Sequence, residues 1–249
     1  MVKVFAYDDS ADVANSVAQY IIKIQDEVLA SAPTFKLAVS GGSLGKVLKR
    51  GLIENDENQA KIQWGKWEVY FSDERLVPLD HEDSNYGLFN EMVLSTLKAK
   101  ALTLPKVYTI DESLLKEDGS KDVEIAEAYS KILPAKLDLI LLGCGPDGHT
   151  CSLFPGHELL KERSKTIANI TNSPKPPPRR ITFTFPVLEA ASSICFVAEG
   201  AGKAPILTQI FSEAKSGLPC ELVNATGVPT AWFVDTAAVK GVPVTVSKF

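Results

Sequence analysis

The sequence lacks the features of a secreted, membrane-spanning or disulfide-stabilised protein. It contains no run of eighteen uncharged apolar residues, and its first residues, MVKVFAYDD, lack the apolar core of a signal peptide. Four cysteines are present, Cys144, Cys151, Cys195 and Cys220, but none forms a CxxC pair. A chain of 249 residues does not need disulfides to be stable. We therefore expect a cytoplasmic protein with reduced thiols and no membrane partner.

Motifs for metal ions and for a nucleophilic serine are also missing. There is no HExxH sequence, no paired Cys/His spacing and no GxSxG elbow. The formal net charge of -5 argues against bulk attraction to nucleic acid. Only Lys175, Arg179 and Arg180 form a basic cluster, and no aromatic residues interleave with them. We expect no metal, no cofactor and no nucleic-acid partner.

The sequence does contain short β-branched runs that alternate with segments of helical period. This alternation is typical of an α/β protein whose mostly parallel sheet has helices on both faces. We predict one doubly wound domain over residues 1–249, and a monomer. The strands are expected at residues 2–7, 35–40, 67–71, 137–142, 181–185, 193–198 and 230–234.

Two helices and two irregular segments can be added to this outline. An apolar face predicts a helix that follows Asp8, Asp9 and Ser10 and ends before Pro33. A second helical stretch is expected at residues 44–53. The acidic residues 111–124 and the proline-rich residues 173–180 are interpreted as insertions, because three successive prolines in the latter forbid helix or ladder pairing.

In open α/β sheets, ligands bind beyond the carboxyl ends of the strands, so the residues after each strand deserve inspection. Ser40-Gly41-Gly42-Ser43 follows the second strand, and its glycines allow backbone N–H groups to point at an anion. The turn lacks the GKS/T ending of a nucleotide P-loop and the spacing of a dinucleotide fingerprint. An anion-binding turn and a turn that needs glycine for packing alone are equally compatible with this motif.

A second polar segment, residues 72–78, places Asp73, Glu74 and Arg75 after the third strand. Arg75 could supply a fork of donors to a phosphate or carboxylate, and Asp73 is a candidate substrate contact. An ordinary polar loop with an internal ion pair remains an equally good interpretation.

The strongest motif is LLGCGPDGHT at residues 141–150, an apolar strand that ends in a glycine-rich turn with Asp147 and His149. The chain has three histidines, and His81 and His157 have no such surroundings. If a helix begins near Thr150, its positive end would help to keep His149 neutral, as a general base requires. We interpret His149 as functional.

Basic residues lie next to two of the later predicted strands. Arg179 and Arg180 precede the strand at 181–185, and Lys203 ends a glycine turn at residues 200–203. A lysine on a solvated face is the usual alternative. Together with Ser43 and Arg75, these residues could form a local positive pocket for an anionic substrate.

Taken in order, seven motifs resemble the 6-phosphogluconolactonase family and cover nearly the whole chain. They are SGGS at 40–43, DERLVP at 73–78, SNYG at 84–87, LLGCGPDGHTCSLFPG at 141–156, RIT at 180–182, GAGK at 200–203 and AWFVD at 231–235. The resemblance implies a modified Rossmann-like fold shared with glucosamine-6-phosphate deaminases. It also implies hydrolysis of 6-phospho-D-glucono-1,5-lactone to 6-phosphogluconate, the second step of the pentose phosphate pathway.

The resemblance carries roles onto individual residues. His149 is implied as the base that activates water, and Arg75 and Lys203 as anion contacts. The related deaminases carry a glutamate where this chain has Phe154, which favours the lactonase over the deaminase. A non-catalytic sugar-phosphate sensor is the other alternative, but the histidine and its glycines are intact.

These roles combine into an expected mechanism. The phosphate is held by Gly41, Gly42 and Ser43 together with Arg180 and Lys203, although the sequence leaves open whether Arg179 or Arg180 binds it. Water activated by His149 attacks the C1 carbonyl, and Asp147 orients the site. The developing oxyanion is stabilised by Arg75 or by N–H groups of residues 143–145.

Overall fold

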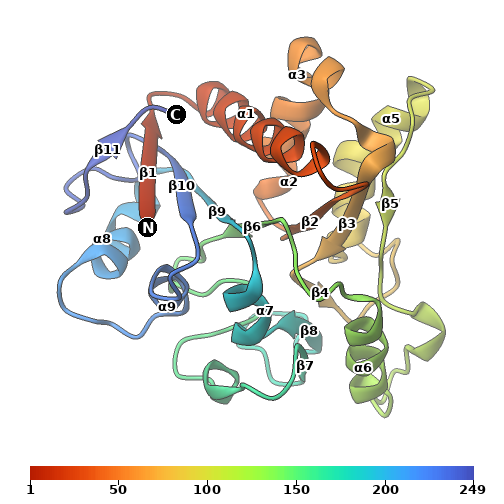
Figure 1. Cartoon of the computed structure of the whole chain (residues 1–249). Coiled ribbons are helices and arrows are strands. Elements are labelled where there is room, and N and C mark those ends of the chain that lie inside the picture. Colours follow the sequence, from red (N-terminus) through yellow and green to blue (C-terminus); the bar gives the residue numbers. More distant parts are fainter.

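The computed structural model describes all 249 residues and places an eight-stranded parallel sheet at the centre of the molecule (Figure 1). Its strands are β1 (Val2–Tyr7), β2 (Phe35–Val39), β3 (Trp67–Phe71), β5 (Lys106–Val107), β6 (Leu139–Gly143), β9 (Ile194–Ala198), β10 (Thr230–Asp235) and β11 (Val246–Ser247). The order across the sheet is β11-β1-β10-β9-β6-β2-β3-β5. Every pairing in this sheet is parallel, which confirms the predicted fold class.

Nine α-helices accompany the sheet. They are α1 (Ser10–Leu29), α2 (Leu44–Leu48), α3 (Asp56–Lys61), α4 (Asn85–Phe89), α5 (Ser95–Ala99), α6 (Asp122–Ile132), α7 (Phe185–Ala190), α8 (Ala204–Phe211) and α9 (Pro219–Asn224). Shorter 3-10 and π turns are η1 (Lys49–Ile53), η2 (Trp64–Lys66), η3 (Asn90–Leu94), η4 (Glu112–Leu114), η5 (Glu158–Lys161) and η6 (Ala201–Lys203). None of the helices combines the length and the apolar character needed to cross a lipid bilayer.

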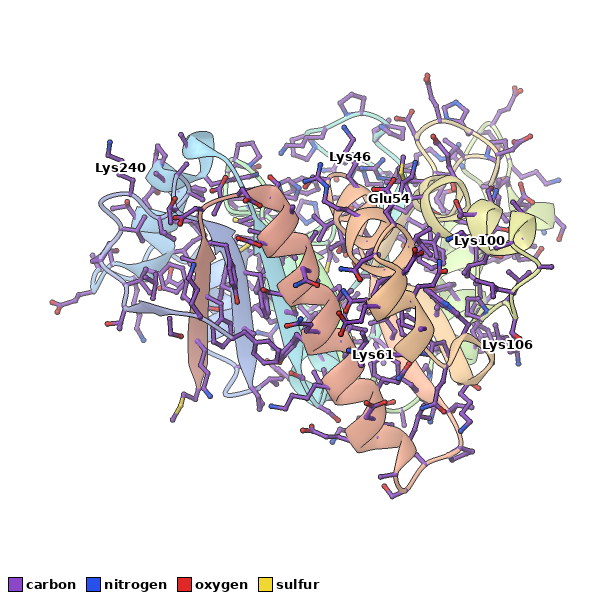
Figure 2. The ribbon with its side chains drawn as sticks, turned by 90° about the horizontal axis from the view of Figure 1, so that it is seen from above. Lys46, Glu54, Lys61, Lys100, Lys106 and Lys240 are labelled. Carbon is purple, nitrogen blue, oxygen red and sulfur yellow. The ribbon has the colours of Figure 1, made fainter.

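The sheet separates two apolar cores. Along β2, the side chains of Leu37 and Val39 belong to one buried cluster and that of Ala38 belongs to the other. This alternation follows from the period of two in a strand, and burial on both faces explains why the strands are continuous apolar runs. Figure 2 shows α1 along one face, with Lys100 and Lys240 at opposite edges of the molecule.

The predicted first helix is confirmed. Asp9 caps α1, because its carboxylate accepts hydrogen bonds from the N–H groups of Ala11 and Asp12 at 2.8 and 2.9 Å. The helix ends at Leu29, before Pro33, as its sequence predicts.

The strand order reverses between β2 and β6, which are parallel neighbours in the sheet. From β2 the chain continues to β3 on one side, whereas from β6 the next strand of the sheet, β9, lies on the other side. In doubly wound folds, this switch point opens a crevice at the carboxyl ends of the two strands. Residues 40–43 and 144–150 follow these two ends directly.

A second sheet was not predicted. It is antiparallel and contains β4 (Asp73–Arg75), β8 (Arg180–Phe183) and β7 (Ile167–Ile170), in that order. The strand predicted at residues 181–185 is therefore present as β8, but it does not belong to the main sheet as expected, and residues 73–75 form a strand where a polar loop was one of two interpretations. Strand β8 ends at Phe183, because Pro186 stands in the first turn of α7, which starts at Phe185.

Candidate functional site

A cavity of about 170 Å³ lies at the carboxyl ends of β2 and β6. Eight of the nine candidate site residues line it: Gly41, Gly42, Ser43, Asp73, Arg75, His149, Arg180 and Lys203. The ninth, Asp147, contacts His149. Within the chain, no group of three or more His, Cys, Asp or Glu side chains is arranged to hold a metal ion.

The turn after β2 presents free backbone donors to this cavity. The N–H groups of Gly41, Gly42 and Ser43 have no acceptor within the chain, and Gly42 has a φ of 69°. Successive unpaired N–H groups of this kind form a concavity that attracts anions. A β-carbon on Gly41 would lie 1.9 Å from Oδ1 of Asn85, so the glycine is also needed for packing. The packing interpretation therefore holds for Gly41, and anion binding by the turn stays a prediction.

The turn after β6 fixes His149. The N–H of Gly145 donates to the carbonyl of His149 at 2.8 Å, and that of Gly148 donates to the carbonyl of Gly145 at 3.0 Å. Gly148 has a φ of 79° and Cys151 one of 52°, so the chain turns twice within a few residues. No helix begins near Thr150, so a helix terminus does not help to keep His149 neutral.

His149 and Asp147 form a hydrogen-bonded pair, with Nδ1 and Oδ1 2.5 Å apart. Although partial burial opposes it, the contacts with His149 and Lys175 lower the pKa of Asp147 to about 2. The carboxylate is therefore ionised near neutral pH and can only accept, which places the proton on Nδ1 of His149. Nε2 then carries the lone pair, and it makes no hydrogen bond within the chain.

Burial, and not a helix terminus, keeps the imidazole neutral. The side chain of His149 is 17% exposed and packs against the ring of Phe154, with centroids 4.9 Å apart. Desolvation lowers the pKa of His149, whereas the carboxylate of Asp147 raises it and the ammonium of Lys175 lowers it. A neutral histidine with a free Nε2 can accept a proton from water.

Asp73 is held rigidly at the cavity wall. Its Oδ2 accepts a hydrogen bond from Ser152 Oγ at 2.8 Å, and its Oδ1 accepts one from Asn85 Nδ2 at 3.2 Å. The neighbouring Glu74 points away from the cavity and accepts the N–H groups of Asn85 and Tyr86 at the start of α4. The three charges of the DER triplet thus have three different environments.

Arg180 is the arginine that faces the cavity. Its guanidinium donates to the carbonyls of Lys175, Pro176 and Pro177, and the residue is 2% exposed. Arg179 points to the opposite side, where it forms an ion pair with Asp122 at 2.5 Å. The sequence left open which arginine contacts the ligand, and this geometry favours Arg180.

Lys203 reaches the cavity from the turn before α8. Its Nζ donates to the carbonyl of Cys144 at 2.6 Å, which links the turn after β9 to the turn after β6. All four cysteines are free thiols and buried, as expected, and Cys144 and Cys151 line the cavity.

Sequence reasoning did not assign several residues that contact the site. Lys175 lies against the Asp147–His149 pair, and Asn85 and Ser152 hold Asp73. Asn85 belongs to the SNYG motif at residues 84–87, but nothing in the sequence pairs it with Asp73. For Lys175 the only signal was its place in a small basic cluster.

Comparisons with known proteins agree with this architecture. Residues 8–232 match the sequence model of a family described as glucosamine-6-phosphate isomerases/6-phosphogluconolactonase. The chain is 47% identical to 6-phosphogluconolactonase 3 of Saccharomyces cerevisiae over 242 residues, with 96% of each chain covered. It is 45% identical to 6-phosphogluconolactonase of Rattus norvegicus over 208 residues, with 83% of this chain and 80% of the rat protein covered.

Solved structures share the fold. The crystal structure of 6-phosphogluconolactonase from Leishmania guyanensis superposes with a TM-score of 0.81 at 24% identity, and 98% of this chain and 100% of that chain are covered. The fold defines an α/β protein with a cavity at its switch point, and that cavity is lined by three cationic side chains, Arg75, Arg180 and Lys203. The chain belongs to the glucosamine-6-phosphate isomerase/6-phosphogluconolactonase family.

Proposed function

We propose that this protein is a cytoplasmic, monomeric enzyme that hydrolyses 6-phospho-D-glucono-1,5-lactone to 6-phospho-D-gluconate in the oxidative pentose phosphate pathway. The observation that carries the proposal is the Asp147–His149 pair, whose unprotonated Nε2 belongs to a cavity that also contains three cationic side chains. The relatives named 6-phosphogluconolactonase support the substrate.

The phosphate of the substrate binds to cationic side chains and to free backbone N–H groups of the cavity. We assign it to the turn at Gly41–Ser43, to Arg180 and to Lys203. Arg75 lies opposite Arg180 in the small sheet, so it joins the same anion site. Asp73 would repel a phosphate, and its carboxylate suits the sugar hydroxyls instead.

In the chemical step, His149 Nε2 removes a proton from water while the water oxygen bonds to C1 of the lactone. The tetrahedral intermediate then expels the ring oxygen, which takes the proton back from His149 and becomes a hydroxyl. Gly145 cannot stabilise the oxyanion, because its N–H is bonded to the carbonyl of His149. The N–H of Cys144 has no acceptor in the chain and is the donor we assign.

Phe154 argues against an isomerase or deaminase reaction. It is 2% exposed and packs on the imidazole at the place where the resemblance puts a glutamate in deaminases. An apolar ring there cannot take part in proton transfer during sugar ring opening. It does contribute to the desolvation that keeps His149 neutral.

The test is hydrolysis of freshly generated 6-phosphogluconolactone, with the spontaneous rate subtracted and the unphosphorylated lactone measured in parallel. His149→Ala is expected to lose about 10²-fold or more in kcat with little change in substrate binding. His157→Ala, which changes a histidine outside the cavity, is the matched control. No acceleration above background by the wild type would contradict the proposal, and turnover of glucosamine 6-phosphate would favour the isomerase.

A further inference from the structure

Lys175 is a charged side chain at the catalytic pair that the proposed reaction does not use. Its Nζ lies 3.3 Å from Oδ1 of Asp147 and 3.1 Å from Nδ1 of His149. Nδ1 carries the proton that it donates to Asp147, so the ammonium cannot donate a hydrogen bond to it. Lys175 therefore donates to the carboxylate and acts on the imidazole through its positive charge.

The backbone around Lys175 is fixed by buried groups. Arg180, itself 2% exposed, donates to the carbonyl of Lys175 at 2.8 Å and to the carbonyls of Pro176 and Pro177 at 3.1 and 3.0 Å. Ser173 Oγ donates to the same Lys175 carbonyl at 2.9 Å. The prolines remove further backbone freedom. These contacts fix the backbone from which the Lys175 side chain extends toward the Asp147–His149 pair.

Charged groups around His149 act on its protonation in addition to burial. Two carboxylates face the ring, Asp147 from its own turn and Asp73 from β4, and both favour the imidazolium form. The thiol of Cys220, from α9, donates to the backbone carbonyl of His149 and carries no charge there. Lys175 is the cation in direct contact with the imidazole, and it opposes the two carboxylates.

We propose that Lys175 is a positioning residue that adds to burial in favouring the neutral, base-competent form of His149 and holds Asp147 against it. The inference rests on the proposed role of His149 as the base. Arg180 contributes indirectly, because it presents Lys175 to the pair as well as facing the cavity.

The direct test measures the titration of His149 by NMR in the substrate-free protein. The chain has only three histidines, so His149→Gln assigns the resonance. In Lys175→Met, the pKa of His149 should rise by about one unit, and Lys175→Arg should restore the wild-type value. Lys161→Met removes an exposed lysine without contact to the pair and should leave the titration unchanged. An unchanged His149 pKa in Lys175→Met would overturn the proposal.

The second measurement is the pH dependence of kcat/KM with the phosphorylated lactone. The acid limb of Lys175→Met should move to higher pH by the same amount as the NMR titration. A rate loss at every pH, without a shift in either profile, would mean that Lys175 acts on the substrate, and would also overturn the proposal. If the NMR shift occurs but the wild type has no lactonase activity, the proposed function fails while the effect of Lys175 on His149 stands.

Discussion

Arg75 and Arg180 stand directly opposite each other on the antiparallel strands β4 and β8. Like charges at directly opposed positions destabilise a sheet, and neither arginine has a carboxylate within ion-pair distance. Arg75 donates to the carbonyl of Asp83 at 2.8 Å, while its Nε is buried without a partner. We therefore expect a bound anion to relieve the repulsion between the two arginines.

This relationship predicts that anions stabilise the protein through Arg75. Inorganic phosphate or 6-phosphogluconate should raise Tm, because a ligand at 100 times its Kd stabilises the folded state by about 2.7 kcal/mol. Arg75→Met should lose most of this shift, while its Tm without ligand stays near that of the wild type. Arg179→Met, which changes the arginine paired with Asp122, should keep the shift, as differential scanning fluorimetry can show. An equal shift in Arg75→Met would refute the assignment.

Gly145 is the position where a single methyl group should damage catalysis most directly. A β-carbon there would lie 1.9 Å from Nδ1 of His149 and 2.8 Å from Oδ1 of Asp147. Gly145→Ala must therefore displace the imidazole, and a misplacement of about 1 Å can cost about 10²-fold in kcat.

The control for this variant is Gly202→Ala, because a β-carbon on Gly202 meets nothing within 4 Å and its φ is not positive. Its kcat should remain close to that of the wild type. Near-normal turnover by Gly145→Ala, with the fold intact by circular dichroism, would be inconsistent with the described turn.

The sequence was sufficient to predict the parallel sheet and the place of the cavity that forms the candidate site. Apolar runs bounded by turn residues identify parallel strands, and ligands bind at the carboxyl ends of such strands. Residues 40–43 and 141–150 could therefore be predicted to lie at the same edge of the sheet. The predicted strands at 2–7 and 67–71 have the observed bounds.

Other features depend on contacts that a sequence does not display. Strand β4 has three charged residues and no apolar alternation, so its pairing with β8 was invisible. Lys175 lies 26 residues from His149 and reaches it only because Arg180 holds the proline-rich loop. No helix starts near Thr150, because the positive φ of Cys151 reverses the chain and Thr182 Oγ1 accepts the N–H of Ser152.

Glu74 should matter for stability more than for catalysis. Its two oxygens accept the N–H groups of Arg75, Asn85 and Tyr86 and the hydroxyl of Ser84, and burial raises its pKa to about 7. In Glu74→Gln, the amide NH₂ would face two of these donors, and leaving buried donors unpaired costs about 1–3 kcal/mol each.

The measurement for Glu74→Gln is urea unfolding, in which the midpoint should fall and the slope should stay constant. Glu91→Gln is a suitable control, since Glu91 is exposed and no hydrogen bond or ion pair involves it. If both variants unfold at the wild-type midpoint, the four hydrogen bonds to Glu74 do not contribute to the free energy of unfolding.

Asp147→Asn separates the orienting role of the carboxylate from its effect on the charge of His149. The carboxylate raises the pKa of His149, so its removal lowers that pKa further and moves the acid limb of kcat/KM to lower pH. An asparagine can also donate to Nδ1, which would leave the proton on Nε2 and remove the base. We therefore expect kcat to fall by about 10²- to 10⁴-fold.

The pH profile of Asp147→Asn is informative because its direction is opposite to that expected for Lys175→Met. Asp80→Asn, which changes an exposed carboxylate away from the cavity, should leave both the rate and the profile unchanged. An acid limb that moves to higher pH in Asp147→Asn would show that the carboxylate does not favour the imidazolium, which contradicts the 2.5 Å contact between Nδ1 and Oδ1. A full rate in this variant would show that His149 needs no partner to present Nε2 to water.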